Sequence, residues 1–195
     1  MKIDSITNKG KSVARGNGIA GETNFNDEFY TPKYAIIPLL QYLTQKANVW
    51  CPFDTGQSNF VSILKEKGFS VTHTHISEGK DFFNTPPPQE CNYIISNPPY
   101  SMKHEVFKRL FELNIPFAML VGVVGLFENK KRFNMFKGND FEIMYFDKRI
   151  SYFKNYNDPK PSLNPPFSSV YITKGILPKQ IVFEELNKET TLKLF

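Results

Sequence analysis

The residues of this 195-residue chain with the clearest chemical potential are Asn97-Pro98-Pro99-Tyr100. The two prolines remove two backbone donors and keep the backbone extended. The segment therefore presents the Asn97 side-chain oxygen and the Pro98 carbonyl as hydrogen-bond acceptors beside an aromatic ring. Such an arrangement suits a flat ligand that carries an amino group, because the oxygens accept its N–H groups and the ring stacks on its face. A turn that is merely rich in proline is the alternative interpretation.

The sequence on either side places this segment at the end of a strand. The apolar run at residues 93–95 is typical of a buried strand, and Val106, Phe107 and Leu110 recur at helical spacing after it. Open α/β sheets bind their ligands at the carboxyl ends of strands. We therefore expect a ligand site at Asn97.

Strand and helix patterns alternate along the chain, which predicts an α/β fold with a mainly parallel sheet and an antiparallel strand near the end. Thr31-Pro32 resembles a helix start with Thr31 as N-cap, and Gly68 ends another predicted helix. A short helix is expected near residues 128–138. The last two strands are expected to form a closing pair. The predicted strands are residues 49–51, 69–76, 93–95, 117–124, 141–146, 169–173 and 180–183.

Length and composition favour a single globular domain. Hydrophobic residues make up 41% of the chain and charged residues 22%, which is ordinary for such a domain. Residues 1–26 lack a hydrophobic period and are expected to be a flexible arm, so the domain is expected to span residues 27–195. The sequence shows no signal peptide and no membrane-length apolar run, so we expect a cytoplasmic protein without a membrane partner.

The net charge and the cysteine content indicate which ligands the protein could bind. The net charge of +5 is compatible with nucleic acid, and the clusters at residues 130–132 and 148–149 are either phosphate contacts or a solvated face. Cys51 and Cys91 cannot form a zinc site by themselves, so no metal is expected.

Several segments together resemble a known enzyme family, the S-adenosylmethionine-dependent adenine-N6 DNA methyltransferases, in particular the small members carried by phages and mobile elements. The resemblance covers about residues 28–173. Residues 96–100 resemble the catalytic motif of the family, and residues 29–32 resemble the element that holds the methionine end of the cofactor. Residues 50–56 lie where the family has its glycine-rich turn. Residues 79–83 resemble the segment that meets the cofactor's adenine.

The resemblance implies a Rossmann-like class I methyltransferase fold with a seven-stranded sheet. It implies catalysis by Asn97, Pro98, Pro99 and Tyr100. It also implies S-adenosylmethionine as cofactor, and the residues implied to bind it are Tyr30, Thr31, Pro32, Pro52, Phe53, Asp54, Gly56, His75, Asp81, Phe82 and Asn97.

Two segments depart from the family pattern. The turn of the family usually contains a Gly-x-Gly pair, whereas here Gly56 is followed by Gln57 and Ser58 and the second glycine is missing. Asp54 is expected to compensate by binding the cofactor's ammonium group. The second strand lacks the acidic residue that usually holds the ribose, and His75 is expected to accept a ribose hydroxyl there. A histidine without a ligand role is the equal alternative.

The expected reaction is methylation of the exocyclic N6 amine of adenine in DNA after the base has been flipped from the helix. Asn97 and the Pro98 carbonyl would accept the two N–H bonds, and Tyr100 would stack on the base. RNA adenine is the alternative substrate, and a non-catalytic nucleic-acid or nucleotide binder is the alternative function. Because only short insertions and a short tail follow the core, we expect relaxed specificity, a short target site, a single-stranded substrate, or a partner protein that supplies target recognition.

Residues 151–168 are rich in Asn, Pro, Ser and Tyr, which predicts an exposed loop. This loop contains a second Asn-Pro-Pro, residues 164–166, which does not follow an apolar strand and receives no catalytic role. A loop that contacts nucleic acid and a plain surface loop are equal interpretations.

Overall fold

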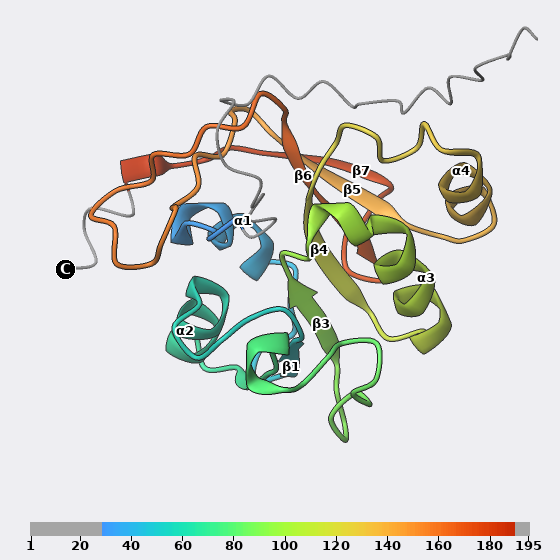
Figure 1. Cartoon of the computed structure of the whole chain (residues 1–195), viewed down its shortest axis with the longest axis horizontal. Helices are drawn as coiled ribbons and strands as arrows, with labels where there is room; N and C mark the ends of the chain where they lie inside the picture. Colours follow the sequence, from blue (N-terminus) through green and yellow to red (C-terminus); the bar gives the residue numbers. More distant parts are fainter. Residues whose placement is uncertain (1–28, 190–195) are drawn as a thin grey trace, which may run out of the picture.

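The computed structural model describes residues 29–189, which form one seven-stranded sheet with helices on both faces (Figure 1). The strand order is β2-β1-β3-β4-β6-β5-β7. The predicted Rossmann-like α/β architecture is therefore confirmed. The strands are β1 (Asn48–Cys51), β2 (Ser70–His73), β3 (Tyr93–Ser96), β4 (Phe117–Gly122), β5 (Glu142–Phe146), β6 (Ser169–Lys174) and β7 (Ile181–Glu184). The predicted arm at residues 1–26 lies outside the described residues.

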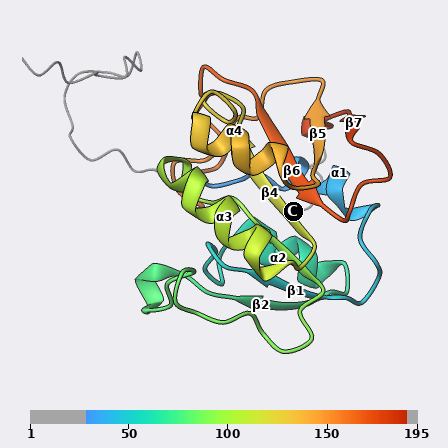
Figure 2. The same cartoon turned by 90° about the vertical axis from the view of Figure 1, so that its right-hand side faces the viewer.

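Strand β6 is antiparallel to both of its neighbours, β4 and β5, whereas the other strand pairs are parallel. The predicted antiparallel strand near the end is thus confirmed. The expected closing pair of β6 and β7 is wrong, because β5 lies between them and β7 pairs with β5 in parallel. Figure 2 shows β1 and β2 at one edge of the sheet and β5 and β7 at the other.

The alternating side chains of the strands supply two separate cores. On β1, Val49 and Cys51 pack with α1 (Ile37–Leu40) and α2 (Asn59–Glu66), whereas Trp50 points into the other core. That second core contains apolar residues of α3 (Lys103–Leu113) and α4 (Lys130–Lys137). Every residue of β4 is buried, as expected for a central strand that is covered on both faces.

The helices largely start and stop at the expected residues. Gly68 has a φ of +85° just after α2, and Asn129 accepts hydrogen bonds from the backbone N–H groups of Lys131 and Arg132 at the start of α4. The predicted N-cap at Thr31 is wrong. The chain there forms a 3-10 turn (Lys33–Ala35) with Pro32 at the N-cap position, and the Thr31 hydroxyl accepts a hydrogen bond from Asn97 instead.

The topology brings several loops together at the carboxyl ends of the parallel strands. Because β1, β3, β4 and β5 are parallel, the segments that follow them leave from the same edge. The antiparallel strand β6 begins there, where the backbone N–H of Val123 donates to Ser168 at 2.9 Å. Residues 97–102, 123–129 and 151–168 therefore lie around one end of the molecule.

Within residues 29–189, no helix is long and apolar enough to span a membrane.

A buried hydrogen bond ties β1 to the chain that leaves β2. The Trp50 indole N–H donates to the Thr74 hydroxyl at 2.9 Å, and the two residues are 0% and 4% exposed. Thr74→Val keeps the side-chain shape but leaves the indole N–H without this partner. We expect the free energy of unfolding, measured by urea denaturation, to fall by about 1–3 kcal/mol.

Thr74→Ser is the matched control, because it keeps the hydroxyl and loses only a methyl group. A Val variant that equals or exceeds the Ser variant in stability would show that the hydrogen bond does not stabilise the fold.

Candidate active site

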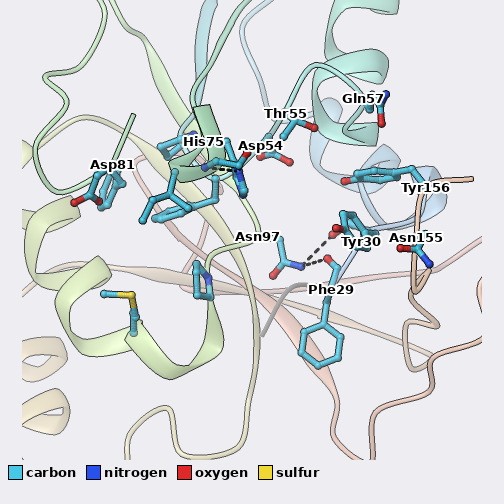
Figure 3. Close-up of a pocket in the computed structure, with 18 of the residues that line it drawn as sticks. Phe29, Tyr30, Asp54, Thr55, Gln57, His75, Asp81, Asn97, Asn155 and Tyr156 are labelled. Carbon is cyan, nitrogen blue, oxygen red and sulfur yellow. Dashed lines mark hydrogen bonds between the residues drawn. The ribbon is translucent and has the colours of Figure 1, made fainter. Parts of the chain in front are cut away.

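A cavity of about 540 Å³ opens at the carboxyl edge of the sheet, a volume ordinary for a small-molecule site (Figure 3). Residues from five segments line it: residues 29–31, the turns after β1 and β2, the segment after β3 and the loop between β5 and β6. The sequence-predicted residues among them are Tyr30, Thr31, Pro52, Phe53, Asp54, His75, Asp81, Phe82, Asn97 and Pro99. In Figure 3, Asp81 and Tyr156 lie on opposite sides of the view, with Asn97 between them.

The Asn97 side chain is held in one orientation by residues far away in the sequence. Its Nδ2 donates to the Phe29 carbonyl at 2.8 Å and to the Thr31 hydroxyl at 3.2 Å. Both N–H bonds are therefore used within the protein. Oδ1 is buried and has no hydrogen-bond partner within residues 29–189. Because a buried acceptor without a partner is costly, this oxygen is the atom of the site most in need of a ligand donor.

The two prolines stiffen the segment that carries Asn97. Pro98 is buried, whereas Pro99 lines the cavity with a φ of −54° and a ψ of 128°. A 3-10 turn (Tyr100–Met102) follows directly and leads into α3. Pro98 lies outside the cavity lining, so its predicted contribution is limited to its backbone.

Tyr100 lies beside the cavity in a cluster of aromatic rings, which we call the aromatic cluster: Phe29, Tyr100, Tyr152 and Phe167. The rings of Phe29 and Tyr100 are stacked, with centroids 4.8 Å apart and planes 25° apart. Phe167 packs against Tyr100 at 5.6 Å. The Tyr152 hydroxyl is 3.2 Å from that of Tyr100 and donates to Ser169 at 2.7 Å. One face of Tyr100 is therefore already covered by Phe29.

Asp54 is a buried carboxylate in the turn after β1. The hydroxyls of Ser58 and Ser96 donate to its two oxygens. Burial raises the pKa of Asp54 from an ordinary 3.8 to about 6, because the hydrogen bonds from Ser58 and Ser96 and the nearby His75 offset the loss of water only in part. A positive charge placed in this part of the cavity would favour the ionised form.

His75 lines the cavity with a defined tautomer. Its Nδ1 accepts the backbone N–H of Ser77 at 3.2 Å and is 2.6 Å from the Ser77 hydroxyl. Because Nδ1 accepts this N–H, the proton of the ring lies on Nε2. The sequence led us to expect an acceptor at His75, as an acidic residue would have been.

Asp81 and Phe82 line the side of the cavity away from Tyr156. The Asp81 carboxylate accepts the backbone N–H of Phe83 at 3.0 Å and the Asn84 side chain at 2.8 Å. The Phe82 ring lies 4.8 Å from that of Phe53. These residues give this side an apolar wall with a carboxylate beside it.

Gly56 lies in the turn after β1, as expected, but not in the cavity lining. Thr55 and Gln57 line the cavity, whereas a Cβ on Gly56 would meet the His73 ring at 3.6 Å. Pro32 likewise belongs to the backbone that carries Tyr30 and Thr31, outside the cavity lining.

The loop at residues 151–168 is largely exposed, as its composition predicts, but its first residues pack into the protein. Tyr152 and Phe153 are buried, and Phe153 forms a β-bridge with Tyr30. Asn155, Tyr156 and Asn157 line the cavity, and the Tyr156 ring lies 4.5 Å from that of Tyr30. Burial raises the pKa of Tyr156, so it stays protonated. This loop therefore closes one side of the cavity.

Sequence reasoning missed several lining residues because no local pattern marks them. Some follow known positions directly, as Thr55, Ile76 and Phe83 do, and proximity to a predicted residue was the available signal. Met102 lies one turn beyond Pro99. Asn155, Tyr156 and Asn157 belong to the loop for which the sequence left a binding role open, but only the long-range path of this loop brings them to the cavity.

The chain matches no protein-family model. It also matches no curated protein. The solved structures that resemble it include two at 16% identity. The type I restriction-modification system methyltransferase subunit from Streptococcus thermophilus has a TM-score of 0.46 and covers 81% of this chain, which spans 47% of that subunit. The protein-(glutamine-N5) methyltransferase from Alicyclobacillus acidocaldarius has a TM-score of 0.35, with 72% of this chain and 86% of that one covered. The chemistry of this chain must therefore be inferred from its own residues.

The raised pKa of Asp54 makes its contribution to stability pH-dependent. A carboxyl whose pKa is higher in the folded state binds more protons when folded between pH 3.8 and about 6, so folding is progressively disfavoured as the pH rises through that window. We expect Asp54→Asn to gain stability relative to the parent protein from pH 4 to pH 7, by on the order of 2–3 kcal/mol.

Urea denaturation of both proteins at several pH values measures this difference. A constant difference, or one that favours the parent protein as the pH rises, would show that the folded-state pKa of Asp54 is not raised.

Proposed function

We propose that the protein is an S-adenosylmethionine-dependent methyltransferase that methylates the N6 amine of adenine in DNA. The observation that carries the proposal is the Asn97 amide, whose nitrogen is occupied by Phe29 and Thr31 and whose buried Oδ1 lacks a partner within residues 29–189. An oriented acceptor between a cavity and a cluster of aromatic rings suits a planar substrate that donates an N–H bond.

The cavity has the chemistry that S-adenosylmethionine requires. Asp54 supplies a buried carboxylate for the ammonium and sulfonium charges, with Tyr30 and Tyr156 beside it. On the other side, Phe53 and Phe82 provide an apolar surface for the adenine ring and Asp81 an acceptor for its amino group. His75 would donate to a ribose oxygen.

When bound, S-adenosylmethionine supplies an electrophilic methyl group on a positively charged sulfur. The proposed role of the protein is to orient the exocyclic amine and make its nitrogen more nucleophilic. The lone pair of an exocyclic amine is delocalised into its ring, so the nitrogen is a weak nucleophile. Asn97 Oδ1 and the Pro98 carbonyl accept its two N–H bonds, which turns the nitrogen toward tetrahedral geometry and directs the lone pair toward the cavity. Asn97 is not a base, so the proton passes to water and catalysis rests on orientation and electrostatics.

The aromatic cluster is the site proposed for the target base. Tyr100 stacks on the base, and Phe167 from the loop before β6 forms a second wall. The Phe29 ring already occupies a face of Tyr100 at 4.8 Å, so it must turn aside when a base enters. A base that leaves a duplex has lost its stacking partners, and these rings would replace them.

One observation favours an enzyme over a nucleotide binder. The stack of Phe29 on Tyr100 adjoins the cavity, so the proposed cofactor and the proposed target base would lie side by side. The positive net charge of the chain fits a nucleic acid, and the proposed site would accept adenine from DNA or RNA. A partner protein that selects the target sequence belongs to the same proposal.

Asn97→Ala removes the oriented acceptor. We expect transfer of labelled methyl from S-adenosylmethionine to DNA to fall at least about 100-fold, as for other preorganised hydrogen-bond groups in active sites. The assay compares duplex DNA, single-stranded DNA, RNA and protein as acceptors, and cofactor binding by calorimetry is measured in parallel.

Asn164→Ala is the matched control, since it changes the first residue of the chain's other Asn-Pro-Pro and lies outside the cavity lining. We expect it to keep activity within about threefold, as is usual for exposed positions. Full activity of Asn97→Ala, or transfer to protein rather than nucleic acid, would contradict the proposal.

Phe29→Ala should make base entry easier, because the ring no longer has to leave Tyr100. An aromatic pair is worth about 0.5–1.5 kcal/mol, so the KM for DNA should fall by about two- to tenfold with kcat largely unchanged. Phe29→Trp keeps a ring in place and should not lower the KM. A rise in KM for Phe29→Ala would mean that this ring belongs to the base-binding surface.

A further inference from the structure

The turn after β4 is held by cations from two helices. The Lys103 ammonium, at the start of α3, donates to the carbonyls of Gly122 at 2.9 Å and Val124 at 3.0 Å. The Arg132 guanidinium, on α4, donates to the carbonyls of Gly125 at 2.6 Å and Leu126 at 3.2 Å. Four carbonyls within five residues are thus anchored by side chains. The turn is therefore a rigid platform.

This platform presents an apolar side chain to solvent. Val124 is 63% exposed, although its backbone carbonyl is fixed by the buried Lys103. The neighbouring Gly125 has a φ of +69°, which turns the chain sharply away after Val124. A rigid backbone with an exposed valine lowers the entropy cost of inserting that side chain into a partner.

The platform adjoins the proposed base site. The Lys103 ammonium lies 5.1 Å from the centre of the Tyr100 ring. A Cβ on Gly122 would meet the Tyr100 ring at 3.3 Å and the Phe167 ring at 2.7 Å. Val124 therefore stands two residues along the chain from the wall of the aromatic cluster. Figure 1 shows the connection from β4 to α4 at the end of the molecule where β6 begins.

The helix that follows the turn adds positive charge and a second exposed apolar side chain. Lys130 and Lys131, at the start of α4, are exposed, and the apolar Phe133 is 53% exposed. Glu128 lies beside them, but its carboxylate is folded back onto the backbone N–H of Phe127 at 3.0 Å. Cations that contact phosphates beside an apolar residue that enters the base stack are a recurrent combination in proteins that distort duplexes.

We propose that Val124 is a wedge that enters the base stack of duplex DNA and fills the gap left by the extruded adenine, with Lys130 and Lys131 on the flanking phosphates. The inference rests on the proposed function and adds to it the form of the substrate, a paired duplex. The aromatic cluster receives the base, and the platform stabilises the helix from which the base has departed.

The test compares methyl transfer to unmethylated plasmid DNA in its duplex form and in its heat-denatured form. Val124→Ser should lower the rate on duplex DNA by about tenfold or more, because the apolar contact within the stack is lost. On denatured DNA the rate should stay within about twofold, since there is no stack to fill. Val124→Ile should keep the duplex rate. Ile181→Ser, at a 46% exposed aliphatic residue on the far edge strand β7, is the matched control and should change neither rate.

The possible outcomes distinguish a failure of the proposed role of Val124 from a failure of the proposed methyltransferase function. Equal losses for Val124→Ser on both substrates, no loss on duplex DNA, or a parent protein active on denatured DNA alone would overturn the wedge and leave the methyltransferase standing. A parent protein that binds S-adenosylmethionine but transfers methyl to no nucleic acid would overturn the proposed function itself, and the wedge with it.

Discussion

The site depends on the fixed orientation of one amide. A side-chain amide that can flip presents a donor and an acceptor alternately, and an enzyme that must accept an N–H bond needs the acceptor every time. Here the Phe29 carbonyl and the Thr31 hydroxyl bind both N–H groups of Asn97, and the oxygen is left for a ligand. The segment at residues 29–31 therefore serves the motif at Asn97 although more than sixty residues separate them. That segment also contributes Tyr30 to the cavity and Phe29 to the aromatic cluster, so the two proposed ligands would meet at the same short piece of chain.

The rest of the fold positions the other residues of the site around the Asn97 amide. Parallel strands bring the turns after β1, β3 and β4 to one edge, and the antiparallel strand β6 makes its preceding loop arrive at the same edge. The loop at residues 151–168 consequently reaches both subsites, with Tyr156 at the cavity and Phe167 at Tyr100. Ser96, the last residue of β3, joins the Asp54 carboxylate to the strand that carries Asn97. The electrostatic and the hydrogen-bonding parts of the site are thus one connected structure.

Sequence patterns predicted the strands and the rigid segment at Asn97, because interactions between residues close in the chain determine both. The apolar runs gave the strands, since a run such as residues 93–95 has few ways to bury itself other than in a sheet covered on both faces. The proline pair in front of Tyr100 limits the backbone wherever it lies. The turn after β1 was also predicted as part of a site, although Gly56 faces His73 and not the cavity. The chemical types of Asn97, Asp54 and Asp81 were therefore visible before the fold was known.

The features that sequence patterns did not predict depend on contacts between residues far apart in the chain. Thr31-Pro32 has the sequence of a helix start, but the Thr31 hydroxyl accepts a hydrogen bond from Asn97 instead of capping a helix. The neighbouring sequence does not reveal this distant partner. The final strand pairs with β5 and not with β6, because the pairing of an edge strand depends on where earlier strands already lie. Residues 151–168 form a largely exposed loop, as their composition predicts, but contacts with Tyr30 and Tyr100 bury Phe153 and Tyr152, which composition does not predict. The histidine tautomer at His75 follows from a backbone N–H two residues away, which only the folded turn brings to Nδ1.

The most direct test of the account is a crystal structure of the protein with S-adenosylhomocysteine and an oligodeoxynucleotide that contains adenine. The account predicts the adenine exocyclic nitrogen at hydrogen-bond distance, roughly 2.7–3.2 Å, from Asn97 Oδ1, with Nδ2 still bound to Phe29 and Thr31 and the Phe29 ring turned away from Tyr100. A complex in which Nδ2 of Asn97 faces the ligand, or in which Oδ1 stays without a partner while both ligands are bound, would contradict it.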